Sequence, residues 1–185
     1  TDEFHNSYLD DVVLSSRIKK LHTMLSSNDD LRILGSFAFV ESALLYTGFA
    51  LLKHFQSQGK NKAISVVAGV NFTSRDEDLH GQCVGEIFKT LKSELLIDGQ
   101  IDADYLRELQ VEIHQVAKAV IEHEEMIATK YFELGEIEGI DLEGLVNFAK
   151  SRVDITLDYL GMERLFNIQD KDNPVSKWFY SGIHQ

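Results

Sequence analysis

The chain has 185 residues, 44% of them hydrophobic, and a formal net charge of −12. This suits one compact domain spanning residues 1–185 with a sizeable core, and the acidic balance argues against a protein that tracks nucleic-acid phosphates. Cys83 is the single cysteine, so an intrachain disulfide framework is excluded and a reducing, cytoplasmic location is expected.

Helical periodicity predicts five helices and no strand. The predicted ranges are 7–27, 29–57, 61–96, 102–134 and 142–161, followed by an irregular tail over residues 164–185. The chain has one proline and is rich in Leu, Ile, Ala, Glu and Lys, which favours long helices. We therefore expect an all-α bundle of long helices.

Residues 33–52 are largely apolar, carry a single charge, Glu41, and are long enough to cross a membrane. The alternative is a helix buried on nearly all sides of a bundle. We favour the bundle, because a charge in the middle of a span is costly and no second span follows.

The third predicted helix has a weak central part, "SVVAGVNFTS", which combines β-branched residues with Gly69 and Asn71. These are poor helix formers, and local distortion often accompanies functional helix segments. We therefore expect irregular structure near residues 70–76.

Three residues are candidate metal ligands. Glu41 lies in the apolar second helix, where a buried carboxylate needs a cation, a hydrogen-bonding partner or a metal. A structural ion pair or a protonated core Glu is the alternative. Glu77 and His80 are three residues apart, so on a helix their side chains point the same way.

One lone Glu and one Glu-x-x-His are half of the ligand set of ferritin-like di-metal bundles. No other histidine follows a Glu by three residues, and "EHEE", which contains His123, is predicted to be a solvated face. Cys83 lies one turn after His80; it is a potential third ligand, although a small buried hydrophobic residue is favoured. Either another chain completes the site, or two copies of this chain combine their halves.

The order of four segments resembles the small, radical-generating subunit of class I ribonucleotide reductase from about residue 30 onward. The segments are "FVESALLYTGFALL", "SRDEDLHGQCVGEIFKTL", "AVIEHEEMIATKYFELGEIEGIDLEGLVNFAKSRVDITLDYLG" and "DNPVSKWF". The resemblance implies a ferritin-like bundle in which Glu41, Glu77 and His80 bind one iron of a di-iron centre, Fe/Fe or alternatively Mn/Fe.

The resemblance also implies roles for neighbouring residues. Asp76 matches an Asp on the radical-transfer path that hydrogen-bonds an iron-bound His, and Arg75 supports the same network. Leu45, Phe49 and Thr73 match the pocket around a radical tyrosine. Thr73 departs from the apolar residue that is usual there, which leaves the use of a tyrosyl radical open.

The family's other Asp or Glu and its first Glu-x-x-His are not found before Glu41, so we expect the C-terminal fragment of a split small subunit, a partial bundle completed by another chain. The implied partners are an N-terminal fragment, a second small subunit and the large catalytic subunit, but neither nucleic acid nor membrane. The implied activity, present only with these partners, is that of ribonucleoside-diphosphate reductase. The alternatives are a ferritin-like ferroxidase completed by homodimerisation and a helical scaffold that has lost its metal.

Overall fold

The computed structural model describes residues 11–181, and this part of the chain is helical apart from turns, loops and one isolated β-bridge. The helices are α2 (Val12–Leu25), α3 (Asp30–Ser42), α4 (Tyr46–His54), α5 (Ile64–Ile97), α6 (Ala103–Tyr131), α7 (Leu142–Tyr159) and α8 (Pro174–Ser181). The expected all-α bundle is confirmed, and four of the five predicted ranges, all except 29–57, each match one helix to within a few residues over the described part of the chain. Residues 7–10 of the first predicted helix lie outside the described residues.

Aspartates begin most of these helices. The side chains of Asp11, Asp29, Asp102 and Asp141 each accept a hydrogen bond from a backbone amide in the first turn of the helix that follows. These bonds satisfy amides that lack a partner inside the helix. The short turn between α5 and α6 contains Gly99, whose φ of +68° suits glycine.

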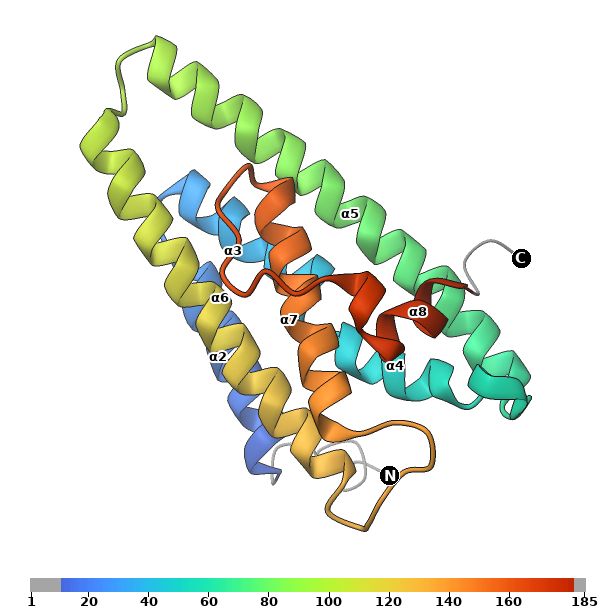
Figure 1. Cartoon of the computed structure of the whole chain (residues 1–185). Helices are drawn as coiled ribbons and strands as arrows, with labels where there is room; N and C mark the ends of the chain where they lie inside the picture. Colours follow the sequence, from blue (N-terminus) through green and yellow to red (C-terminus); the bar gives the residue numbers. More distant parts are fainter. Residues whose placement is uncertain (1–10, 182–185) are drawn as a thin grey trace.

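The two longest helices, α5 and α6, diverge from this turn, and α7 lies between them (Figure 1). Helix α3 lies behind α7 in this view and packs along α5, whereas α8 packs against α7 and α4. One apolar core joins α3, α5, α6 and α7 around Phe39, Phe88, Ile113 and Leu157. A second core forms where α8 and α4 meet α7, around Tyr46, Phe148 and Phe179.

The second predicted helix is broken, and one continuous helix over 29–57 is therefore wrong. The break falls at residues 43–45, between α3 and α4. The carbonyl of Phe39 accepts from the amides of both Ala43 and Leu44, at 3.1 and 3.0 Å, which is a local widening of the helix. The break begins two residues after Glu41, so it shapes the end of the helix that carries this carboxylate.

The irregular structure expected near residues 70–76 is not observed, because α5 is continuously α-helical from Ile64 to Ile97. Packing explains the difference, since Val67, Val70 and Ser74 are buried against neighbouring helices and tertiary contacts outweigh weak local propensity. The irregular tail expected from residue 164 is also wrong in part, because Pro174–Ser181 form α8.

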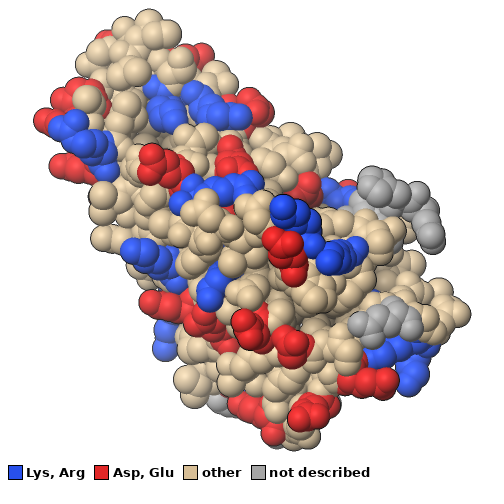
Figure 2. Space-filling model, in the orientation of Figure 1, with Lys and Arg blue, Asp and Glu red and all other residues tan. Residues whose placement is uncertain are grey.

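Residues Asp30–His54 are long and apolar enough to cross a membrane by length and composition, but 56% of the most apolar window is buried inside the protein. This is the behaviour of a core helix. On the face drawn in Figure 2, acidic and basic side chains of the described residues are interspersed, without an extended area of one sign.

Candidate metal centre

The candidate ligands converge where α3 packs against α5. Glu41 lies in the last turn of α3, and Glu77 and His80 lie one turn apart on α5. The helices approach closely because Gly81 has no side chain: a Cβ there would lie 1.6 Å from the Oγ of Ser42. The residues that directly follow two of the ligands, Glu41 and His80, therefore form the contact between the helices.

The donor atoms form a compact group. Nδ1 of His80 lies 3.0 Å from Oε2 of Glu41 and 3.3 Å from Oε2 of Glu77. The carboxylates are mostly buried, whereas 57% of the His80 side chain is exposed. The site is thus closed on the protein side and open to solvent on the side of His80.

The electrostatics of the group favour a cation. Burial raises the pKa of Glu41, and the neighbouring Glu77 carboxylate raises it further, although His80 acts in the opposite direction. Hydrogen bonding to Glu77, and then to Glu41, raises the pKa of His80. A protonated imidazole is the positive charge that these carboxylates attract when no other cation is present.

The residues fit a metal ion. Two atoms bound at about 2.1 Å to one ion in adjacent positions lie about 3 Å apart, and the two His80–carboxylate distances are close to this value. Within residues 11–181, Glu41, Glu77 and His80 are the one group of three such residues whose donor atoms all lie within 4.8 Å of one another. Carboxylate and imidazole donors together suit iron, manganese or zinc.

The alternative of a structural ion pair with Arg or Lys is not what the structure contains. Glu41 pairs with His80, and no Arg or Lys bridges to it among the described residues. Cys83 is exposed and outside the group, so both a sulfur ligand and the favoured small buried residue are wrong at this position.

Comparison with known proteins identifies a family that matches most of the chain. The sequence profile of the family "Ribonucleotide reductase, small chain" matches residues 1–174. The chain belongs to the ribonucleotide reductase small-chain family. The match starts at residue 1, well before residue 30, where the resemblance was expected to begin.

Solved structures share the ferritin-like fold of this family. Dimanganese(II)-NrdF of Streptococcus sanguinis has a TM-score of 0.72 and 21% identity, with 91% of this chain and 56% of that chain covered. A putative class I ribonucleotide reductase from Bacillus halodurans has a TM-score of 0.78 and 21% identity, with 97% and 63% covered. The chain therefore spans about three fifths of the length of these structures. A sequence search of curated proteins finds no significant match.

The other residues assigned from the small-chain resemblance lie around the ligand group but outside it. Asp76 and Arg75 are exposed on α5. Leu45 is 37% exposed, at the break before α4, and Thr73 is exposed, with its hydroxyl donating to the carbonyl of Gly69.

Phe49 packs edge-on against Tyr46, with ring centroids 5.5 Å apart. It is the one half-buried residue of the three assigned to the radical pocket. The other two residues assigned to the radical pocket, Leu45 and Thr73, are thus exposed to solvent.

One segment that was predicted to be solvated is buried. His123 and Glu124, in "EHEE", are each 1% exposed on α6, and Arg17 of α2 contacts both. The prediction is wrong for these two residues because both point toward α2 and the α3–α4 break. The sequence did contain a signal, since Ile113, Ala117, Val120 and Glu124 follow helical spacing along one face.

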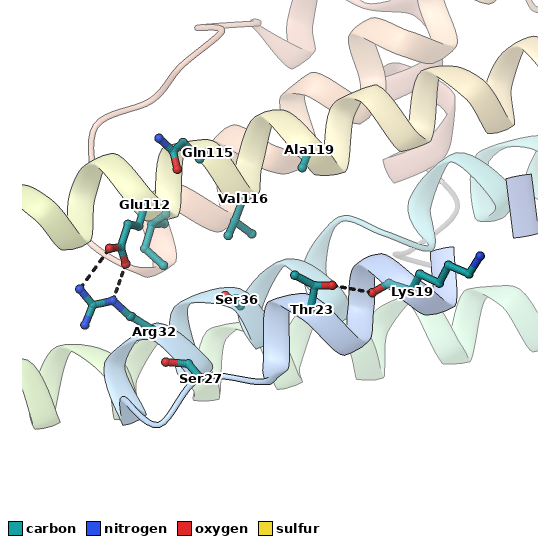
Figure 3. Close-up of a pocket in the computed structure, with 10 residues that line it drawn as sticks. Lys19, Thr23, Ser27, Arg32, Ser36, Glu112, Gln115, Val116 and Ala119 are labelled. Atoms are coloured by element: carbon teal, nitrogen blue, oxygen red, sulfur yellow. Dashed lines mark hydrogen bonds and ion pairs between the residues drawn. The ribbon is translucent and has the colours of Figure 1, made fainter. Parts of the chain in front are cut away.

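A hollow of about 600 Å³ lies between α2, α3 and α6 (Figure 3). Among the described residues, Glu112 is the one carboxylate that lines it, and it pairs with Arg32. The described lining of the hollow therefore contains no group of metal donors.

Proposed function

We propose that this chain supplies one half of the di-metal centre of a class I ribonucleotide reductase small subunit. The observation that carries the proposal is the convergence of Glu41, Glu77 and His80 in a member of the small-chain family. These residues hold one ion of an Fe/Fe or Mn/Fe pair. When bound, the metal pair supplies oxygen activation and the oxidising equivalent that the large catalytic subunit uses to make deoxyribonucleotides in the cytoplasm.

The chain's own residues place ligands and exclude water. His80 binds a metal as a neutral imidazole, so it gives up the proton that its carboxylate neighbours favour. Asp76 orients an iron-bound His from the rest of the site and lies on the radical-transfer path, with Arg75 in support. Leu45, Phe49 and Thr73 form a dry pocket once a neighbouring helix covers them.

An apolar face of α5 supports the need for such a neighbour. Phe72, Leu79 and Ile87 are 67%, 58% and 54% exposed, and their spacing of seven and eight residues places them on one side of the helix. Asp76 lies on the same side, next to the open side of His80. We propose that the helices carrying the missing ligands cover this face.

The source of the missing ligands defines two versions of the proposal. In the first version, a separate N-terminal polypeptide supplies them, and the complete small subunit pairs with a second copy and with the large subunit. In the second, they come from this chain, because Asp2 and His5 have the spacing of Glu77 and His80 with Asp in place of Glu. Asp2 and His5 lie outside the described residues.

Metal stoichiometry tests the proposal. The purified chain is loaded with Fe(II) without oxygen, oxygen is admitted, and iron per chain, oligomeric state and any radical signal are measured. His5→Ala and Glu41→Gln are treated in parallel. The split version predicts no stable pair of irons until the N-terminal polypeptide is added, and no effect of His5→Ala.

The other outcomes are distinct. Two irons per chain that depend on His5 would favour the one-chain version. Two irons per homodimer on a symmetry axis would favour a ferritin-like ferroxidase. Iron binding that survives Glu41→Gln unchanged, or no iron under any condition, would overturn the proposed metal centre.

A further inference from the structure

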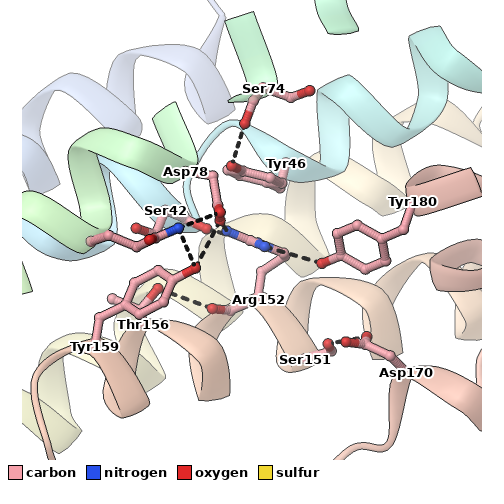
Figure 4. Close-up of polar contacts among 11 residues, drawn as sticks. Ser42, Tyr46, Ser74, Asp78, Ser151, Arg152, Thr156, Tyr159, Asp170 and Tyr180 are labelled. Carbon is pink, nitrogen blue, oxygen red and sulfur yellow. Dashed lines mark hydrogen bonds and ion pairs between the residues drawn. The ribbon is translucent and has the colours of Figure 1, made fainter. Parts of the chain in front are cut away.

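One buried arginine connects the two helices that carry the candidate ligands. Arg152 of α7 is 2% exposed. Its Nε donates to the carbonyl of Ser42 at 3.0 Å, and its Nη2 donates to Oδ1 of Asp78 at 2.7 Å (Figure 4). Ser42 directly follows Glu41 and Asp78 directly follows Glu77. A single side chain from a third helix therefore binds the residue next to each carboxylate ligand.

The contact with Ser42 is a consequence of the helix break. In an uninterrupted helix the carbonyl of Ser42 would accept from the amide of Tyr46, but that amide donates to the carbonyl of Ala43 at 3.2 Å. A buried carbonyl without a partner is costly. Arg152 supplies the partner and so fixes the backbone immediately after Glu41.

The rest of the guanidinium is also held. Its Nη1 donates to the hydroxyl of Tyr180 at 3.0 Å, and its central carbon lies 3.9 Å from the ring centroid of Tyr46. Asp78 accepts a further hydrogen bond from Tyr159 at 3.0 Å. A planar guanidinium can serve three acceptors in fixed directions, which an ammonium group cannot do with the same geometry.

The two ends of this network differ in what they contact. Ser42 and Asp78 belong to the ligand-bearing helices α3 and α5, whereas Tyr180 belongs to α8, which carries no candidate ligand. If Arg152 served only to stabilise the fold, the loss of either end would act through stability alone. If it places the ligands, loss of the Asp78 contact will alter metal binding more than loss of the Tyr180 contact.

We propose that Arg152 is a positioning residue of the metal centre: by holding Ser42 and Asp78 it sets the separation and direction of Glu41 and Glu77. The inference rests on the proposed function, since it takes these two carboxylates as ligands. It adds a residue on a third helix, more than seventy positions from Glu77 in the sequence, to those that determine metal affinity.

The test uses the full chain in the assembled form that binds metal, with Co(II) and Mn(II) as probes. The variants are Asp78→Asn and Arg152→Met. Asp78 is partly exposed, and its replacement by Asn conserves the volume of the side chain. The matched control is Tyr180→Phe, which removes the opposite contact of the same guanidinium. Asp154→Asn is a second control, because Asp154 is fully buried on the same helix and binds the amides of Leu165, Phe166 and Ile168.

We expect Asp78→Asn to weaken metal binding by about 10- to 100-fold, the effect typical of groups that orient ligands. The visible Co(II) spectrum should change as well, because the coordination geometry changes. Tyr180→Phe and Asp154→Asn should lower the melting temperature of the metal-free protein and leave both the affinity and the spectrum close to wild type. Arg152→Met should resemble Asp78→Asn if it folds.

Three results would overturn the inference. Wild-type affinity and an unchanged Co(II) spectrum in Asp78→Asn would overturn it while leaving the metal centre intact, and so would affinity losses that follow melting temperature equally in all variants. Absence of metal binding by the wild-type protein would overturn the proposed function and this inference together.

Discussion

Nη2 of Arg17 lies 2.8 Å from Oε1 of Glu124, a carboxylate that is 1% exposed between α2 and α6. The same nitrogen donates to the carbonyl of Leu44 at 2.9 Å, and Nε of Arg17 donates to Nε2 of His123 at 2.9 Å. Arg17 therefore connects a buried carboxylate to the break between α3 and α4. Breaking a buried pair by removing one partner is strongly destabilising.

The first prediction concerns the pH dependence of this pair. Burial raises the pKa of Glu124 to about 7 from its ordinary 4.5, despite the opposing charge of Arg17. Between these values the folded protein binds more protons than the unfolded chain, so the contribution of Glu124 to stability falls as pH rises. Relative to Glu124→Gln, the wild type should lose stability from pH 5 to pH 7, by up to about 1.4 kcal/mol per pH unit.

Chemical denaturation of both proteins at several pH values measures the difference. A difference that stays constant from pH 5 to pH 7 would mean that Glu124 titrates near its ordinary value. The carboxyl carbon signal of Glu124 in NMR gives an independent check, because it should titrate near neutrality.

The second prediction is that Glu41→Gln separates metal affinity from stability. The variant should lose most metal binding, because it replaces one of the two carboxylate donors with a neutral amide. The metal-free variant should be as stable as wild type or more so, since Glu41 is buried beside the like charge of Glu77. Isothermal titration with Mn(II) and thermal melting without metal measure the two effects.

Glu86→Gln is the control for this substitution, because Glu86 is an exposed carboxylate on α5 that pairs with Lys89. It should leave metal affinity unchanged. A clear loss of stability in metal-free Glu41→Gln would mean that the ion pair with His80 outweighs the repulsion.

The third prediction concerns two glycines of α5. A Cβ at Gly85 would lie 2.6 Å from the backbone oxygen of Tyr159, whereas at Gly81 the obstacle is the hydroxyl of Ser42. Each change to Ala should therefore destabilise the fold by about 1–3 kcal/mol, as overpacking usually does, in spite of the better helix propensity of Ala.

A second substitution, Ser42→Ala, distinguishes the two glycine positions. The hydroxyl of Ser42 is buried without a hydrogen-bond partner among the described residues, so Ser42→Ala should be nearly neutral and should recover part of the loss in Gly81→Ala. The same change should not help Gly85→Ala, because its obstacle is backbone. Equal recovery in both double variants would contradict this explanation.

The fourth prediction is that Asp76→Asn retains metal and impairs radical transfer. Asp76 is exposed and outside the ligand group, so its loss changes a charge and a proton position without removing a ligand. Reductase activity and metal content are measured together in the complete enzyme. Loss of all metal would make Asp76 a ligand, and full activity would remove it from the pathway.

Local pattern was sufficient to predict most of the helices and the three candidate ligands. Glu77 and His80 follow from spacing on one helix, and Glu41 was conspicuous as a lone charge in an apolar segment. The break at residues 43–45 was not predictable locally, because "ESALLYTGF" contains no proline and continues the helical pattern. The carbonyl of Leu44 within the break accepts a hydrogen bond from Arg17, and the carbonyl of Ser42 directly before it accepts one from Arg152. Both arginines are too far away in the sequence for the local pattern to reveal these contacts.

Arg152 itself could have been noticed. It follows Leu145, Phe148 and Ala149 at helical spacing, which places a charge on the buried face of α7. Its partners could not be predicted from the sequence. One is a backbone carbonyl that the break leaves without a hydrogen-bond donor in its own helix, and another is a carboxylate on a different helix. Near residues 70–76 the error is the opposite one: a distortion was expected, but α5 is continuous. Packing there outweighs the weak helix propensity of the local sequence.

The break between α3 and α4 also constrains the order of folding. Its carbonyls are bonded by arginines 27 and 110 positions away in the sequence, so the bend cannot be completed until α2 and α7 have both docked. Contacts of such long range form late, because the intervening chain must first be brought together. During synthesis, the carboxylate of Glu41 therefore reaches its final direction only after most of α7 has left the ribosome, so the proposed metal centre can be completed only after that step.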